Sequence, residues 1–157
     1  MFERIEEIKA YIHVSKYLDI QILRPYIETA ISERVRPLVG EVIWEKLSDV
    51  SFVMPRKAEI YEGVKKAVAN YAIAYSIPFV KMHLSSTGAN AYQDNKMERS
   101  PWWDVRDYGL NAVRIGDHAL NGAVALLSTS SLGAELPFAR ELAGSLFGSP
   151  RELSALY

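Results

Sequence analysis

Residues 55–78 read PRKAEIYEGVKKAVANYAIAYSIP, and this stretch decides the fold class. Its larger apolar side chains recur at steps of three and four residues, which places them on one face of an α-helix. This apolar set is Ile60, Val64, Ala67, Val68, Tyr71, Ala72 and Tyr75. Proline suits the first turn of a helix and disfavours its continuation, so Pro55 and Pro78 predict the two ends. The many alanines make this helix thin and favour close approach of a neighbouring helix.

A second helix is predicted upstream, with Asp19 as its N-cap. It begins at about Ile20, or at Arg24 with Pro25 in its first turn, and Pro37 is expected to end it. Its predicted buried stripe is Ile22, Tyr26, Ile27, Ala30, Ile31 and Val35.

Two shorter helices complete the N-terminal half. Apolar spacing predicts one over residues 3–12 and another that begins at Glu41. The side chains of the latter that are expected to face the core are Val42, Ile43 and Leu47.

Beyond Pro78 the apolar period changes from 3.6 to 2, which predicts a half-buried strand. Turn-forming residues 85–88 follow, and residues 89–93 are suited to a weak returning strand. We therefore predict a small β-hairpin at about residues 79–93.

The last long helix is predicted from Ser100-Pro101 to about Leu127, because a hydroxyl N-cap followed by proline is a helix-start signal. Each of its three glycines costs roughly 1 kcal/mol relative to alanine. We therefore expect close packing at Gly109, Gly116 and Gly122.

Together these elements predict a mainly α fold, a bundle of four to five helices with a small β-hairpin. Residues 1–128 are predicted to form one helical domain that includes the hairpin. Residues 129–157 are predicted to form a C-terminal arm with a short terminal helix, since Ser149-Pro150 repeats the helix-start signal.

Composition excludes several classes of function. The formal net charge is −1, too balanced for a protein that coats nucleic acid. No cysteine is present, which excludes disulfides, thiolate metal sites and cysteine nucleophiles. No apolar run reaches the ~18 residues needed to cross a bilayer, so no membrane association is expected.

Motifs for catalysis are also weak. Nucleophile-elbow, phosphate-loop and dinucleotide fingerprints are missing from the sequence. Asp104 and Asp107 lie one helical turn apart, and two carboxylates so placed could support an enzyme or hold a divalent cation. The reading we favour is that Asp104 complements the helix dipole and Asp107 pairs with Arg106 or a neighbour. The histidines lack partners at zinc-ligand spacing: these are His13, His83 and His118. We expect no catalysis, metal or cofactor.

Exposed aromatic and apolar side chains are the stronger candidates for function, because aromatics are enriched at interface hot spots. At least one residue of the Trp102-Trp103 pair is expected to anchor the core, and the other suits either the core or an interface. The candidate interface residues are Trp102, Trp103, Tyr71, Tyr75, Tyr92, Leu153 and Tyr157.

Residues 18–40, LDIQILRPYIETAISERVRPLVG, resemble the opening of phage head–tail connector (adaptor) proteins. In those proteins an early Asp-rich turn leads into a helix of the form Leu-x-x-Tyr-Ile-x-x-Ala. The longer order of motifs adds the alanine-rich helix ending in Ile77-Pro78, the strand-turn of residues 80–88 and the Pro-Trp-Trp helix start. This order is similar to an uncharacterised group of small proteins carried in phage and prophage structural gene clusters of gut bacteria. The likeness covers about residues 3–127.

The resemblance implies a structural virion protein without catalysis, assembled in the host cytoplasm. It implies a homo-oligomeric ring, a dodecamer by analogy, between the portal protein and the tail or stopper protein. DNA would pass through the ring only as cargo. By the same analogy residues 80–92 would lie near the channel or a neighbour, and the arm after Ser128 would dock on a partner. The alternative to this structural role is a small helical homodimeric binding or regulatory module that associates through the alanine-rich helix.

Overall fold

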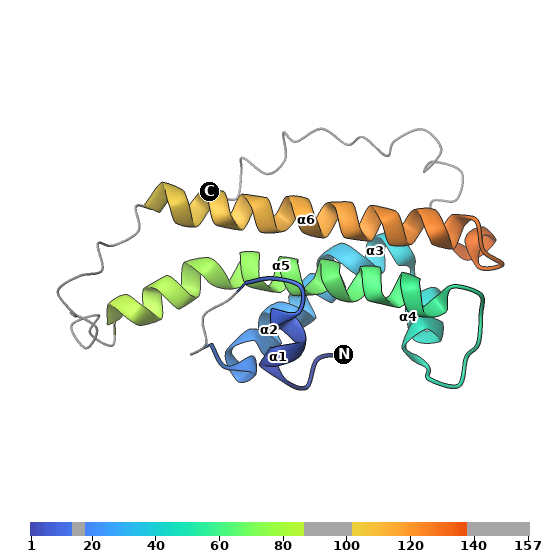
Figure 1. Cartoon of the computed structure of the whole chain (residues 1–157), viewed down its shortest axis with the longest axis horizontal. Coiled ribbons are helices and arrows are strands. Elements are labelled where there is room, and N and C mark those ends of the chain that lie inside the picture. Colours follow the sequence, from blue (N-terminus) through green and yellow to red (C-terminus); the bar gives the residue numbers. More distant parts are fainter. Residues whose placement is uncertain (14–17, 87–101, 138–157) are drawn as a thin grey trace.

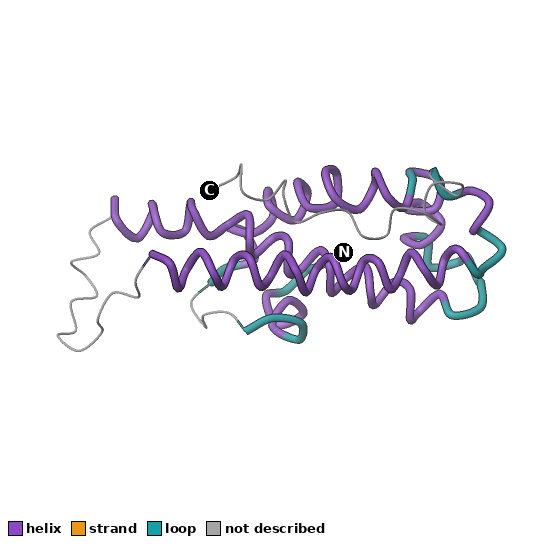
Figure 2. Tube along the Cα trace, turned by 90° about the horizontal axis from the view of Figure 1, so that it is seen from above, coloured by secondary structure: helices purple, strands orange, loops and turns teal. Residues whose placement is uncertain are grey.

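The computed structural model describes residues 1–13, 18–86 and 102–137, with the backbone alone for 78–86 and 102–105. Its described part is mainly helical, as predicted, and every segment drawn in Figure 2 outside the grey trace is helix or loop. The elements in chain order are α1 (Ile5–Lys9), α2 (Ile20–Ala30), η1 (Ile31–Val35), α3 (Arg36–Val39), α4 (Glu41–Ser48), α5 (Lys57–Ser86), α6 (Trp102–Ser128) and η3 (Gly133–Glu135).

Helix α5 is the central element of the bundle. Helix α6 runs antiparallel along one side of it, and α2 packs on another side (Figure 1). Residues 67–74 are consecutively buried, since neighbours cover more than one face of this section. A helix covered in this way needs no continuous polar stripe, which explains why alanine, valine and isoleucine dominate here.

The predicted β-hairpin is not supported. Helix α5 continues through Pro78 to Ser86, so the segment expected to form the first strand is helical. Adding residues to an existing helix costs far less than nucleating a new element, and an isolated two-stranded hairpin is marginally stable in water. A period of two over five residues was too short to outweigh helix propagation. Residues 87–93 of that prediction lie outside the described residues.

The second predicted helix begins where expected and ends later. The carboxylate of Asp19 accepts a hydrogen bond from the backbone N–H of Gln21 at 3.0 Å, which confirms the N-cap. Pro37 does not end the helical path, because the π-helical segment η1 shifts the hydrogen-bond register just before it. Pro37 then falls in the first turn of α3, where a missing N–H costs least. Gly40, with φ 85°, ends this path before α4.

Two predicted core residues face solvent instead. Ile22 and Val42 are exposed, while Leu23, Ile43 and Leu47 fill the core positions of α2 and α4. Apolar periodicity locates a helix more reliably than it locates the edge of its buried stripe.

The helical domain extends beyond Ser128. Leu132 and Leu136 are buried in the same core as α6, and Glu135 accepts a hydrogen bond from the Lys46 ammonium at 2.7 Å. The segment up to Leu136 is therefore part of the domain and not of a separate arm. The remainder of the predicted arm, residues 138–157, lies outside the described residues.

Candidate functional site

A polar cluster joins three elements of the bundle. Arg34 comes from η1, Tyr71 and Tyr75 from α5, and Asp117 from α6. Arg34 Nε donates to the Tyr75 hydroxyl at 2.9 Å, and the Tyr71 hydroxyl donates to Asp117 Oδ1 at 2.6 Å. The Arg34 guanidinium carbon lies 5.8 Å from the centre of the Tyr71 ring, within the range of a cation–π contact.

The electrostatics keep the Tyr71 phenol protonated and the Arg34 guanidinium charged at neutral pH. Burial, then the hydrogen bond to Asp117, raises the pKa of Tyr71 far above the usual 10.0. Burial of Arg34 opposes its charge, but the hydrogen bond to Tyr75 and the nearby Tyr71 and Asp117 outweigh it and raise its pKa. A protonated phenol and a charged guanidinium act here as hydrogen-bond donors that fasten helices together.

A glycine in α6 creates the space for the Tyr71 ring. A Cβ built on Gly116 would lie 2.8 Å from Tyr71 Cε1, closer than such atoms approach in proteins. The expected close packing at Gly116 is therefore confirmed. The same prediction is wrong at Gly122, where no atom lies within 4 Å of an added Cβ.

Asn70, next to Tyr71 in the sequence, is buried with only part of its hydrogen-bonding capacity used. Asn70 Nδ2 donates to the backbone carbonyl of Lys66 at 2.8 Å, whereas Asn70 Oδ1 has no hydrogen-bond partner among the described residues. A buried oxygen without a hydrogen-bond partner costs stability.

The connection between α4 and α5 has the opposite character, because apolar side chains point into solvent. Val50 is 96% exposed and Val53 is 88% exposed. Val42, on the outer side of α4, is 56% exposed. We call these three valines the apolar edge; the connection lies at the right-hand end of the molecule in Figure 1.

Hydrogen bonds hold the connection in shape. The Lys57 ammonium donates to the carbonyl of Phe52 at 2.8 Å and to that of Asp49, and it lies 5.6 Å from the centre of the Phe52 ring. The Asp49 carboxylate accepts from the backbone N–H and hydroxyl of Ser51 at 2.8 and 2.7 Å. Arg56, in the left-handed region at φ 60°, ends the turn and pairs with Glu59 at 2.7 Å. The valines are thus presented on an ordered backbone.

The predicted interface residues differ in how exposed they are and in whether the structure describes them. Tyr71 is 1% exposed and is a core residue, so it is not retained as an interface candidate. Tyr75 is half-buried and bonded to Arg34. Trp102 and Trp103 begin α6 with only their backbone described. The other predicted interface residues lie outside the described residues: Tyr92, Leu153 and Tyr157.

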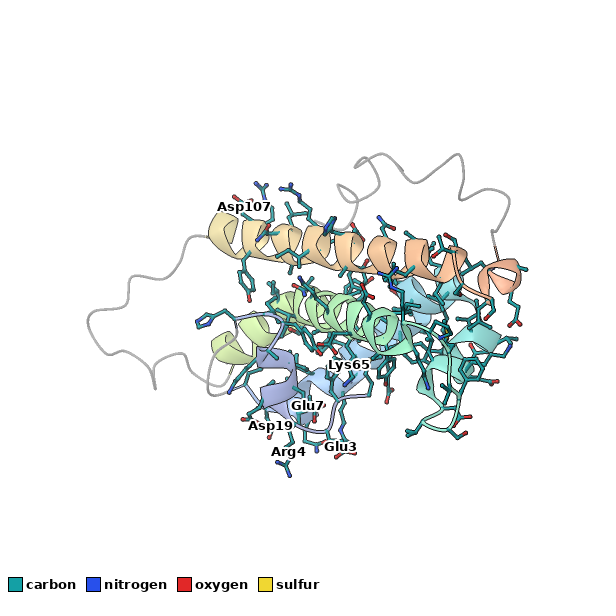
Figure 3. The ribbon with its side chains drawn as sticks, turned by 45° about the vertical axis from the view of Figure 1, so that its right-hand side comes forward. Glu3, Arg4, Glu7, Asp19, Lys65 and Asp107 are labelled. Atoms are coloured by element: carbon teal, nitrogen blue, oxygen red, sulfur yellow. The ribbon has the colours of Figure 1, made fainter. Side chains whose placement is uncertain are left out.

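The favoured reading of Asp107 agrees with the structure. Asp107 is exposed and pairs with Arg106 at 3.3 Å, and Figure 3 shows it near the start of α6 on the side away from α5. The side chain of Asp104 is not described. Within the described ranges no three His, Asp or Glu residues gather as a metal site would need. No helix in those ranges is both long and apolar enough to cross a membrane.

The family model that matches this chain covers residues 35–131, from the end of η1 to just beyond α6. Its description is "family of unknown function (DUF6712)". The chain belongs to the DUF6712 family. The matched segment contains the apolar edge, both tyrosines of the cluster and Asp117, while Arg34 lies one residue before it. No curated protein and no solved structure matches the chain.

The apolar edge was missed by the sequence analysis, although a signal for it exists. The connection SDVSFVMPR, residues 48–56, carries two valines and a phenylalanine where loops usually carry polar residues. An apolar-rich segment between two confident helices is either folded inward or offered to a partner. The structure folds Phe52 partly inward and leaves Val50 and Val53 outside.

Proposed function

We propose that this DUF6712 protein is a structural virion protein, a head–tail connector (adaptor) that forms a ring of identical subunits and performs no catalysis. Two lines of support lead to this proposal. The resemblance of residues 18–40 and of the later motifs to connector proteins supports the specific role. The apolar edge supports the general one, assembly through protein–protein contacts.

The observation that carries the proposal is the exposure of Val50 and Val53 on a hydrogen-bonded backbone. Covering a valine side chain contributes about 1.5 kcal/mol to association. Because Lys57 and Asp49 already order the turn, little conformational entropy is lost when a partner covers it. A rigid turn with two bare valines is therefore well suited to a protein interface.

The partners and location in this proposal follow from the resemblance. The ring would sit between the portal protein and the tail or stopper protein, within the virion, after assembly in the bacterial host cytoplasm. A dodecamer is the ring size that the analogy suggests. DNA would cross the ring as cargo.

The alternative, a homodimeric module that associates through the alanine-rich helix, is less well supported. Residues 67–74 of that helix are buried within the chain and packed among its own neighbours. They offer no free surface to a second copy in this fold.

Light scattering coupled to size exclusion, followed by negative-stain electron microscopy, tests the proposal. We expect concentration-dependent oligomers above the dimer and annular particles. A strict monomer at high concentration, or a closed dimer that forms no rings and does not bind a phage portal protein, would contradict it.

A further inference from the structure

The charge around the apolar edge indicates what can cover it. Along residues 41–53 the exposed charged side chains are all carboxylates: Glu41, Glu45 and Asp49. Val42 and Glu45 lie three residues apart on one side of α4, and Asp49 follows as the C-cap of this helix. Glu45 has no ion-pair partner among the described residues. A matching surface must therefore combine small or apolar side chains with positive charge.

The outer face of α6 has this combination. Arg114, His118, Gly122 and Ala125 are exposed and follow at steps of four, four and three residues, which aligns them on one face. Beyond Asp107 no carboxylate of α6 is fully exposed. Within the described part of the chain Arg114 has no ion-pair partner.

Gly122 is a second indication that another chain binds this face of α6. A glycine inside a helix costs roughly 1 kcal/mol relative to alanine. Gly116 is needed within the chain, because a Cβ there would clash with the Tyr71 ring. An added Cβ at Gly122 would instead meet open space. A bare backbone on an exposed face lets another chain approach closely.

Among the described residues, Ile22 on α2 and Tyr108 on α6 are also exposed apolar positions. Carboxylates outnumber cations near Ile22 along α2: Asp19 lies one turn before it and Glu28 further along, with Arg24 between them, and all three are exposed. Figure 3 shows Glu3, Glu7 and Asp19 on the same side of the molecule, with Arg4 beside them. Like charges across an interface suppress docking, so the apolar edge, with Glu45 and Asp49 beside it, is expected to avoid this side.

Resting on the self-assembly proposed above, we infer that the apolar edge of one copy docks on the outer face of α6 in a second copy. Val50 and Val53 pack against Gly122 and Ala125, and Glu45 and Asp49 face the Arg114 guanidinium and the hydrogen-bonding imidazole of His118. The α4–α5 connection and α6 lie on opposite sides of α5 in Figure 1, and the two patches share no residue, so the contact is head-to-tail. A head-to-tail contact repeats from copy to copy and closes into a ring when its rotation permits.

The cysteine-free chain allows a direct test by disulfide crosslinking. Val53→Cys and Ala125→Cys are made as separate full-length proteins, mixed, and oxidised mildly. We expect covalent dimers in the mixture, and far less when either variant is oxidised alone. The matched control is Val53→Cys mixed with Glu28→Cys, which places the second thiol on the acidic side of α2.

The possible results separate this inference from the proposal on which it rests. A dimer of Val53→Cys with itself, or with Glu28→Cys in preference to Ala125→Cys, overturns the docking surface. If light scattering shows oligomers but Val53→Cys and Ala125→Cys form no crosslink with each other, the docking surface is also overturned. Self-assembly is then still supported. A monomeric preparation removes both.

A charge-reversal pair gives a second measurement that does not depend on oxidation. Glu45→Lys and Arg114→Glu are each expected to weaken self-association about two- to fivefold at low salt, the range for exposed ion pairs. Combining both reversals should restore it, and salt should reduce all the differences. Equal loss in the single and double variants, with thermal unfolding unchanged, contradicts the pairing.

Discussion

The cluster around Tyr71 and the apolar edge depart from the usual distribution of residues in opposite directions. The first places a phenol, a second hydroxyl and a guanidinium among buried helices, and the second places valines in water. In the cluster the hydroxyls of Tyr71 and Tyr75 and the guanidinium of Arg34 have partners within the chain. At the edge the backbone is satisfied and the side chains are not covered. The comparison teaches that an internal partner marks a residue used for folding, while an uncovered side chain on an ordered backbone marks one available for assembly.

The largest expected effect tests whether the cluster depends on its packing. Gly116→Ala forces a Cβ against the Tyr71 ring, whereas Gly122→Ala adds a Cβ in open space. Both gain the helix propensity of alanine, so the difference between them isolates overpacking. We expect Gly116→Ala to be about 1–3 kcal/mol less stable than Gly122→Ala in urea unfolding. Equal stabilities would show that the ring moves freely.

The next effect concerns the hydrogen bond inside the cluster. Tyr71→Phe keeps the ring and removes the hydroxyl that donates to Asp117, so we expect a loss of about 1–2 kcal/mol at pH 7.

The pH dependence supplies a second readout. Because folding raises the pKa of Tyr71, its contribution is present below the ordinary tyrosine pKa of 10.0 and declines as the pH rises above it. The wild type should therefore lose stability above about pH 10 more steeply than Tyr71→Phe. Parallel profiles by circular dichroism would mean that the phenol is not coupled to folding.

The smallest expected effect tests the edge. Val50→Ser and Val53→Ser should change the free energy of unfolding of the isolated subunit by less than about 0.5 kcal/mol, since both side chains are already in water. Self-association, measured by light scattering, should weaken in the same variants. A clear loss of subunit stability would show that Val50 and Val53 stabilise the folded subunit. The edge would then no longer differ from the cluster in this respect.

The sequence by itself determined the local elements. The 3.6-residue period of residues 55–78, the Asp19 cap and the Ser-Pro start of the last helix predicted where helices lie, because these signals depend on neighbours along the chain. The helix start at Ile20, the helix at Glu41–Ser48 and the end of α6 near Leu127 agree with the structure. The lack of cysteine excluded disulfides and thiolate chemistry in the same way.

Tertiary structure decided which faces of the helices are buried against other helices. Proline was expected to end helices at Pro37 and Pro78, yet a π-helical register shift and continued helix propagation carry the chain past both. Pairing of Arg34 with Tyr75 and of Tyr71 with Asp117 joins residues far apart in sequence, and no local pattern encodes it. The exposure of Ile22, Val42, Val50 and Val53 has the same origin, because burial depends on where α2, α5 and α6 meet. The sequence thus located the helices, and only their packing separated the tyrosine that belongs to the core from the valines that remain available to a partner.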